Sequence, residues 1–188
     1  MFKDFCFVVM GYQSWDIEIG SNCKNLAIEL AKNNKVLYVN LPIDRKAYYK
    51  LNHNKSEKKR ISVLRDGDAQ IEKVSDNLWS FYPKTIYESV NWIGLNSLYD
   101  FLNKRNSQRL CSEIRVALGK LNFEKFILFN DSDMFRGVFV KQLLKPDFYI
   151  YYIRDNLISQ SYFQKHGSRT EPITIKNADL VVANSTYL

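Results

Sequence analysis

The chain has 188 residues, of which 46% are hydrophobic and 25% charged, values typical of one globular domain with a substantial core. No segment approaches roughly eighteen consecutive apolar residues, so we expect no transmembrane helix, and the first residues lack the features of a signal peptide. Three dispersed cysteines and two histidines disfavour a disulfide framework or a zinc site and fit a reducing cytoplasm.

Hydrophobic patterns along the chain predict strands that alternate with helices. The predicted strands comprise residues 5–10, 36–39, 61–64, 78–82, 126–129, 148–153 and 180–183. The predicted helices comprise a segment after the N-cap Ser21, residues 97–121, residues 135–144 and a short helix capped by Thr170. The strand–helix–strand unit over residues 5–39 favours a right-handed crossover between parallel strands. We therefore predict a single α/β domain over residues 1–188, with a Rossmann-like parallel sheet and helices on both faces.

Most of the net charge of +7 lies between residues 44 and 60, where seven lysines and arginines accompany two acids. We interpret this segment as one basic loop. It is either a solvated, mobile loop or a contact for anionic lipid headgroups or an anionic substrate, with Tyr48, Tyr49 and Leu51 as interfacial anchors. Nucleic acid is the least favoured partner because no recognition motif accompanies the charge.

Polar side chains follow five of the predicted strands at their carboxyl ends. They are Gly11, Tyr12, Gln13 and Ser14, then Asn40, then Asn130, Asp131, Ser132 and Asp133, then Arg154, Asp155 and Asn156, and finally Asn184, Ser185 and Thr186. Each of these alone is a common turn or cap residue. Ligands of open α/β sheets bind beyond the carboxyl ends of the strands, so the whole set predicts one cleft for a polar ligand.

Three further features have competing interpretations. Asp131 and Asp133 form an Asp-x-Asp motif that suits Mg²⁺ or Mn²⁺, but aspartate is also a preferred N-cap for the helix that follows. His166 lies in a predicted loop, where a solvated histidine is the simpler interpretation. Of the three tryptophans, we expect Trp15 to stack on a sugar, because it lies in the polar turn after the first strand.

Three stretches are similar to one enzyme family. Residues 178–185, ADLVVANS, resemble the A-D-x-V-x-x-x-S strand that closes the N-terminal domain of retaining, glycogen-synthase-like GT-B glycosyltransferases, often called families 1 and 4. Residues 22–42 resemble that group's first helix and second strand. Residues 147–156, DFYIYYIRDN, resemble a strand and loop of the group, with Asp155 at its acidic position.

The resemblance implies one half of a GT-B fold, which transfers a sugar from a nucleotide-sugar donor to a glycan or lipid-linked acceptor. The chain would supply the acceptor side, without a metal or a further cofactor, and the nucleotide-sugar domain would be absent, so that the chain alone is inactive. We expect Asp155 and Asp131 to be catalytic. The expected substrate-binding residues are Gly11, Tyr12, Gln13, Trp15, Asn130, Arg154 and Ser185.

The same resemblance implies a bacterial enzyme of polysaccharide biosynthesis in the cytoplasm, at the inner face of the membrane, with residues 44–60 against anionic lipid. Two alternatives stay open. One is a metal-dependent GT-A transferase that uses Asp131 and Asp133. The other is a non-enzymatic basic module that binds nucleic acid or another anionic polymer.

Overall fold

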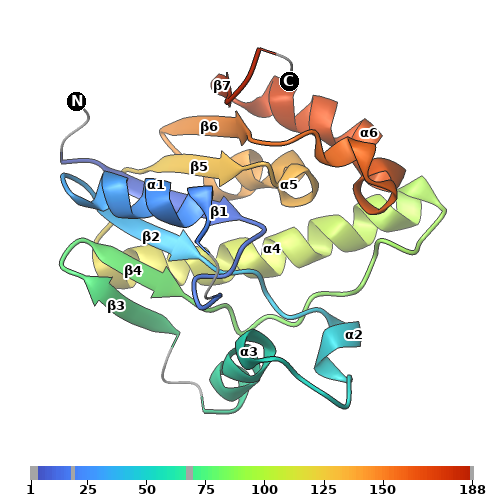
Figure 1. Cartoon of the computed structure of the whole chain (residues 1–188), viewed down its shortest axis with the longest axis horizontal. Helices are drawn as coiled ribbons and strands as arrows, with labels where there is room; N and C mark the ends of the chain where they lie inside the picture. The colour runs from blue at the N-terminus through green and yellow to red at the C-terminus, as the bar shows by residue number, and fades with distance from the viewer. Residues whose placement is uncertain (1–3, 18–19, 67–69, 187–188) are drawn as a thin grey trace.

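The computed structural model describes residues 4–17, 20–66 and 70–186. A seven-stranded sheet forms its centre, in the order β3-β4-β2-β1-β5-β6-β7 (Figure 1). Its strands are β3 (Ile71–Ser75), β4 (Leu78–Phe81), β2 (Lys35–Val39), β1 (Cys6–Gly11), β5 (Ile127–Asp131), β6 (Phe148–Ile153) and β7 (Leu180–Ala183). All neighbouring pairs run parallel except β3 and β4. The predicted Rossmann-like α/β class is therefore confirmed.

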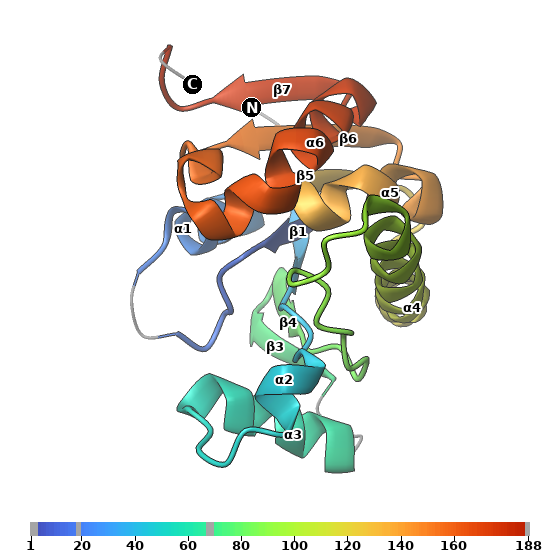
Figure 2. The same cartoon turned by 90° about the vertical axis from the view of Figure 1, so that its right-hand side faces the viewer.

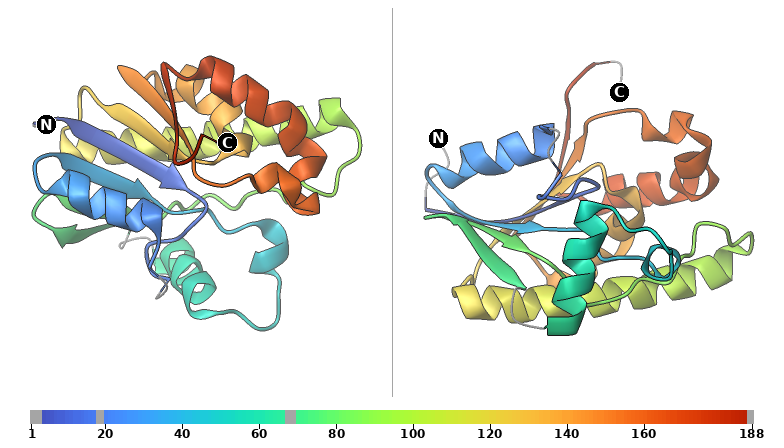
Figure 3. Two further views of the ribbon diagram at one scale, coloured as in Figure 1. Left: turned by 45° about the horizontal axis from the view of Figure 1, so that its top comes forward. Right: turned by 60° about the horizontal axis from the view of Figure 1, so that its bottom comes forward.

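Helices cover both faces of this sheet. They are α1 (Asn22–Ala31), α2 (Arg45–Tyr48), α3 (Lys55–Asp66), α4 (Asn96–Leu121), α5 (Met134–Leu144), the 3₁₀ turn η1 (Leu157–Ser159) and α6 (Ser161–Asn177). Helix α1 packs on one face, whereas α4 and α5 pack on the other and α6 lies against α5 (Figure 2). Helix α4 runs along one face of the sheet and extends past the carboxyl ends of the strands, where α2 and α3 also lie (Figure 3). None of the helices in the described ranges is both long and apolar enough to cross a bilayer.

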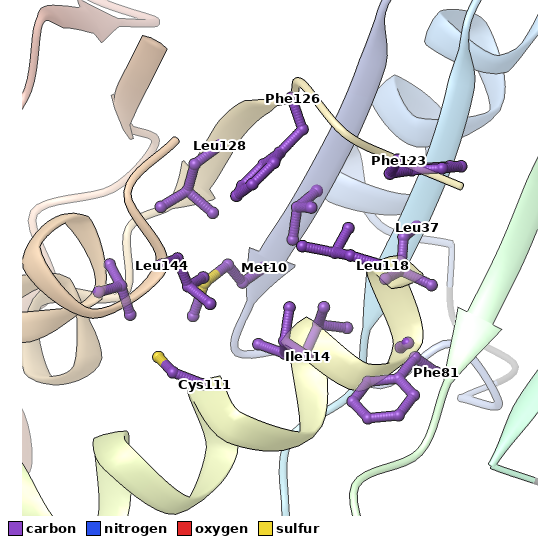
Figure 4. Close-up of a cluster of buried hydrophobic side chains, with 14 of the residues drawn as sticks. Met10, Leu37, Phe81, Cys111, Ile114, Leu118, Phe123, Phe126, Leu128 and Leu144 are labelled. Atoms are coloured by element: carbon purple, nitrogen blue, oxygen red, sulfur yellow. The ribbon is translucent and has the colours of Figure 1, made fainter. Parts of the chain in front are cut away.

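Alternating strand residues form two separate cores. On the α4 side, Met10, Leu37 and Leu128 pack against Ile114 and Leu118 of α4 (Figure 4). On the α1 side, alternate strand residues from β1 and β2 pack against Cys23, Ala27 and Ala31. The central strands β1 and β2 are buried on both sides, which is why the sequence shows continuous apolar runs there, whereas the edge strands β3 and β7 are largely exposed.

The prediction of a basic loop followed by a strand at residues 61–64 is wrong. Helices α2 and α3 occupy this region, and residues 61–64 lie inside α3. Before α3, the side chain of Asn54 accepts a hydrogen bond from the backbone of Glu57, and the Glu57 carboxylate accepts one from the backbone of Asn54. This reciprocal capping box begins helix α3, so the charged residues that follow are helical. The antiparallel edge strand β3 was not predicted.

The prediction around Thr170 also needs correction. Helix α6 begins at Ser161, so Thr170 lies within it and Pro172 is an interior proline. An interior proline costs a helix about 3 kcal/mol, and packing against α5 offsets this cost. Thr174 donates to the Met134 carbonyl across that contact at 3.1 Å. His166 is accordingly a buried helical residue whose ring stacks on Tyr99, with 3.7 Å between ring centroids, and not a loop residue.

The direction in which successive strands are added to the sheet reverses between β1 and β5. From β1 the chain crosses toward β2 and β4, whereas from β5 it crosses toward β6 and β7. After β1 the chain continues over one face of the sheet, and after β5 it continues over the other face. Such a switch point is where open α/β sheets bind their ligands.

Candidate ligand pocket

A pocket of about 620 Å³ opens at the carboxyl edge, on the α4 side of the switch point. Tyr12 reaches it from the turn after β1, and Asp133 and Arg136 reach it from the turn after β5 and the first turn of α5. The rest of its wall comes from α2, α3, the start of α4, the start of α6, and the irregular segment of residues 87–92. A cavity thus lies beyond the strand ends, but only Tyr12 and Asp133 of the predicted cleft residues line it.

Aromatic rings form much of this wall. They belong to Tyr12, Tyr87, Trp92, Tyr99, Phe135 and Tyr162. Trp92 and Tyr162 are 76% and 63% exposed at the pocket. Two hydrogen bonds connect the backbones of these residues to the wall, one from Asn91 to the Tyr162 carbonyl at 3.1 Å and one from Lys165 to the Trp92 carbonyl at 2.7 Å. An uncovered aromatic ring is available to stack on a flat, partly apolar ligand.

A buried ion pair lies at the base of the pocket. Asp133 and Arg136 are both almost fully buried and hydrogen-bonded to each other. Asp133 also caps α5 by accepting the Arg136 backbone N–H at 3.1 Å, as the capping interpretation predicted. Arg136 Nη2 donates to the Gly11 carbonyl at 2.9 Å, which ties α5 to the end of β1. Burial, together with the Asp133 charge, raises the pKa of the Tyr12 hydroxyl well above its usual value.

Several polar groups of the pocket wall have no hydrogen-bond partner within the described residues. They are Nη1 of Arg136, Nε of Arg60, and the hydroxyls of Tyr87 and Tyr99. Buried donors without partners cost about 1–3 kcal/mol each in a folded protein. The Tyr12 hydroxyl belongs to the same set, and all of these atoms are themselves buried, so they lie behind the surface of the cavity.

A second group of predicted residues gathers on the opposite face of the switch point. Arg154 forms ion pairs with Asp131 at 3.0 Å and with Asp155 at 2.9 Å. The Asp131 side chain is 1% exposed beside Cys23, whereas that of Asp155 is 58% exposed. Burial raises the pKa of the Asp131 carboxyl, and the Arg154 charge opposes that shift. Asp131, Arg154 and Asp155 thus form one cluster, separate from the pocket wall.

The Asp-x-Asp motif does not converge on one point. Ser132 lies between the two carboxylates in the left-handed region, with φ of 58°, and its hydroxyl donates to the Tyr152 carbonyl at 3.1 Å. Asp131 pairs with Arg154 and Asp133 with Arg136, on opposite faces of the sheet. Across residues 4–17, 20–66 and 70–186, no three acidic, histidine or cysteine side chains are grouped to hold a metal ion.

The remaining predicted residues have mainly internal contacts. A Cβ at Gly11 would come within 3.2 Å of both Asp131 and Cys23, so glycine permits α1 and β5 to approach β1. The Gln13 carbonyl accepts a hydrogen bond from Tyr38 at 2.9 Å. Trp15 packs edge-on against Tyr38, with 5.2 Å between ring centroids, on the α1 side.

Asn130 and Ser185 also lie apart from the pocket. Asn130 is fully buried and donates to Tyr149 at 2.8 Å and to the Asp133 carbonyl at 3.0 Å, so it braces the turn between β5 and α5. Ser185 follows β7 at the far edge of the sheet. Of the predicted substrate-binding residues, Tyr12 alone lines the pocket.

Sequence reasoning missed the segment of residues 87–92, which supplies six lining residues including Trp92. It has no helical or strand periodicity, and its position depends on contacts distant in sequence. Backbone hydrogen bonds pair Tyr87 with Ile43 and Arg45, and the Asn106 side chain holds both backbone groups of Glu88. A tryptophan in an irregular, polar stretch was the one available signal.

The fold and the pocket define a Rossmann-like α/β protein with an aromatic, polar cavity at its switch point. No protein-family model matches the chain, and no curated protein matches it either.

Proposed function

We propose that the chain is the acceptor-side domain of a GT-B glycosyltransferase and that the pocket binds the acceptor sugar. The observation that supports this most strongly is the pocket itself. It lies at the topological switch point and combines exposed aromatic rings with polar and charged side chains. Sugars present apolar C–H faces and many hydroxyls, so they need both kinds of partner.

The two clusters suggest a division of roles across the switch point. In our proposal, Tyr12 contacts the acceptor on the α4 side, while the half-exposed Asp155 and its partner Arg154 orient the donor on the α1 side. Asp131 is buried in the ion pair and positions Arg154. A second domain would bind the nucleotide and complete the site, so the chain by itself would not turn over a nucleotide sugar.

Peripheral membrane contact is also part of the proposal. Tyr49 and Leu51, between α2 and α3, are 70% and 97% exposed beside the basic residues of segment 44–60. These features suit anionic headgroups and the membrane interface. Vesicles containing anionic lipid should bind the chain more strongly than neutral vesicles, and Leu51→Ser should reduce that binding. Equal binding to both vesicles would contradict this part.

The experiment that tests the function is a binding comparison with the purified chain. We expect saturable binding to oligosaccharides on a glycan array, with no requirement for metal. Tight Mn²⁺-dependent binding of a nucleoside diphosphate would instead favour a GT-A transferase. Steeply salt-dependent binding of nucleic acid would favour a basic binding module.

A further inference from the structure

The charged residues of the pocket are unevenly neutralised. All four lining carboxylates already have partners: Asp44 accepts from Ala47 and Ser89, Glu57 pairs with Lys50, Glu88 pairs with Arg45, and Asp133 pairs with Arg136. Lys46, Arg60 and Lys165 also line the pocket, and within the described ranges none of them has a carboxylate within ion-pair distance. Because the partners of Asp44 are neutral, the charges left without a counter-charge in the described part of this wall are three positive and one negative.

Arg60 is the most constrained of these cations. Its Nη2 donates to the hydroxyls of Ser14 and Ser56, at 2.8 Å for Ser56, and its Nε has no partner within the described residues. Asp16 is the carboxylate with the largest effect on it, and Ser56 lies between the two, donating to Asp16 at 2.9 Å. Two of the five guanidinium N–H donors are thus held by neutral hydroxyls, and no carboxylate pairs with Arg60 within the described residues. A planar guanidinium in this state suits a carboxylate or phosphate.

We infer that the acceptor held in this pocket carries an anionic group, a carboxylate or a phosphate, bound by Arg60 with help from Lys46 and Lys165. This inference rests on the proposed function, because it specifies the chemistry of the acceptor. Trp92 and Tyr162 provide the stacking surface for the sugar ring, and the cations recognise its charged substituent.

The test compares matched sugars by NMR titration of the chain. Cellobiuronic acid is compared with neutral cellobiose, and mannose 6-phosphate with mannose and with inorganic phosphate. We expect one anionic sugar to bind at least about tenfold more tightly than its neutral counterpart, since a charge-assisted hydrogen bond contributes about 1.5–3 kcal/mol. Arg60→Gln should remove that preference, while Arg65→Gln, at an exposed position on the same helix, should keep it.

Each other outcome has a defined meaning. Equal binding of charged and neutral sugars in the pocket contradicts the inference and leaves the proposed function standing. No binding of any sugar contradicts both. Inorganic phosphate that binds as tightly as mannose 6-phosphate contradicts recognition of a charged sugar. If Arg60→Gln lowers the melting temperature, the test is repeated with Lys46→Gln, which changes an exposed residue. A Lys46→Gln variant that still prefers the anionic sugar to the same extent counts against the inference.

Discussion

Individual tryptophans of this chain have opposite surroundings. Trp92 is 76% exposed at the pocket, whereas the Trp15 ring packs on Tyr38. We predict that Trp92→Ala weakens sugar binding about tenfold with little change in stability, because its ring is exposed and, in our proposal, contacts the ligand. Trp15→Ala should lower the free energy of unfolding by about 2 kcal/mol and leave the affinity of the folded protein unchanged. Urea unfolding and glycan titration of both variants check this, and the reverse pattern would contradict it.

The buried pair of Asp133 and Arg136 makes a prediction about stability. Asp133→Ala removes the carboxylate and leaves a buried guanidinium without its counter-charge, so the free energy of unfolding should fall by about 3–5 kcal/mol. The control is Asp76→Ala, which breaks the exposed Lys73–Asp76 pair and should cause no measurable change in stability. Chemical denaturation measures both. An effect of Asp133→Ala as small as that of the control would show that the pair is not buried.

His166 makes stability depend on pH. Burial lowers the pKa of its imidazole, and the Lys165 charge adds to that shift. The unfolded chain takes up this proton near pH 6.5, above the pKa in the folded state, so the free energy of unfolding should fall as the pH drops below about 6.5. We predict that His166→Phe, which keeps a ring against Tyr99, flattens the decline between pH 7.5 and 5.5. Urea titrations at both pH values measure it, and an unchanged decline would contradict the assignment.

At the scale of elements, the contact of α5 with α6 depends on Gly137. A Cβ at that position would come within 2.4 Å of Thr174, whose hydroxyl is fixed by the Met134 and Thr170 carbonyls. Gly137→Ala should therefore destabilise the fold by about 1–3 kcal/mol. The same substitution at Gly119, where nothing lies within 4 Å, should stabilise α4 by up to about 1 kcal/mol. Thermal unfolding compares the two, and a neutral Gly137→Ala would mean that the helices are not in close contact.

The strands that consist of continuous apolar runs were predictable from the sequence. The strands at residues 148–153 and 180–183 match the structure, because both are continuous apolar runs, although β7 lies exposed at the edge of the sheet. Helix α3 was not predicted, since its charged first half masked the capping box of Asn54 and Glu57. Helix α6 was missed upstream of Thr170 because Pro172 suggested a helix start, whereas tertiary packing keeps it inside a longer helix.

The candidate site was only partly predictable for a related reason. The strand ends gave Tyr12, but the irregular segment around Trp92 and the position of α3 depend on contacts that no local pattern encodes. The sequence also did not indicate to which face of the sheet each polar side chain at a strand end points. Residues i and i+2 of a regular strand point to the same face, but the left-handed Ser132 breaks this pattern, so Asp131 and Asp133 reach different sides of the sheet.

At the scale of the whole molecule, the topology concentrates function on one edge. Five parallel pairs bring the carboxyl ends of six strands together, and α2, α3, the start of α4 and the start of α6 surround them. The opposite edge carries only short connections, such as that between β3 and β4 (Figure 1). Conserving this arrangement while varying the surrounding segments would change the ligand without changing the core.

The most direct measurement is NMR mapping of an oligosaccharide that binds the isotope-labelled chain. Our proposal predicts chemical-shift changes at the Trp92 indole and at the amides of Tyr12, Asn91 and Tyr162, all in the pocket wall. The matched Trp92→Ala variant should lose these shifts. Changes confined to other surfaces, or shifts that appear only with a nucleoside diphosphate and Mn²⁺, would contradict an acceptor pocket at this edge of the sheet.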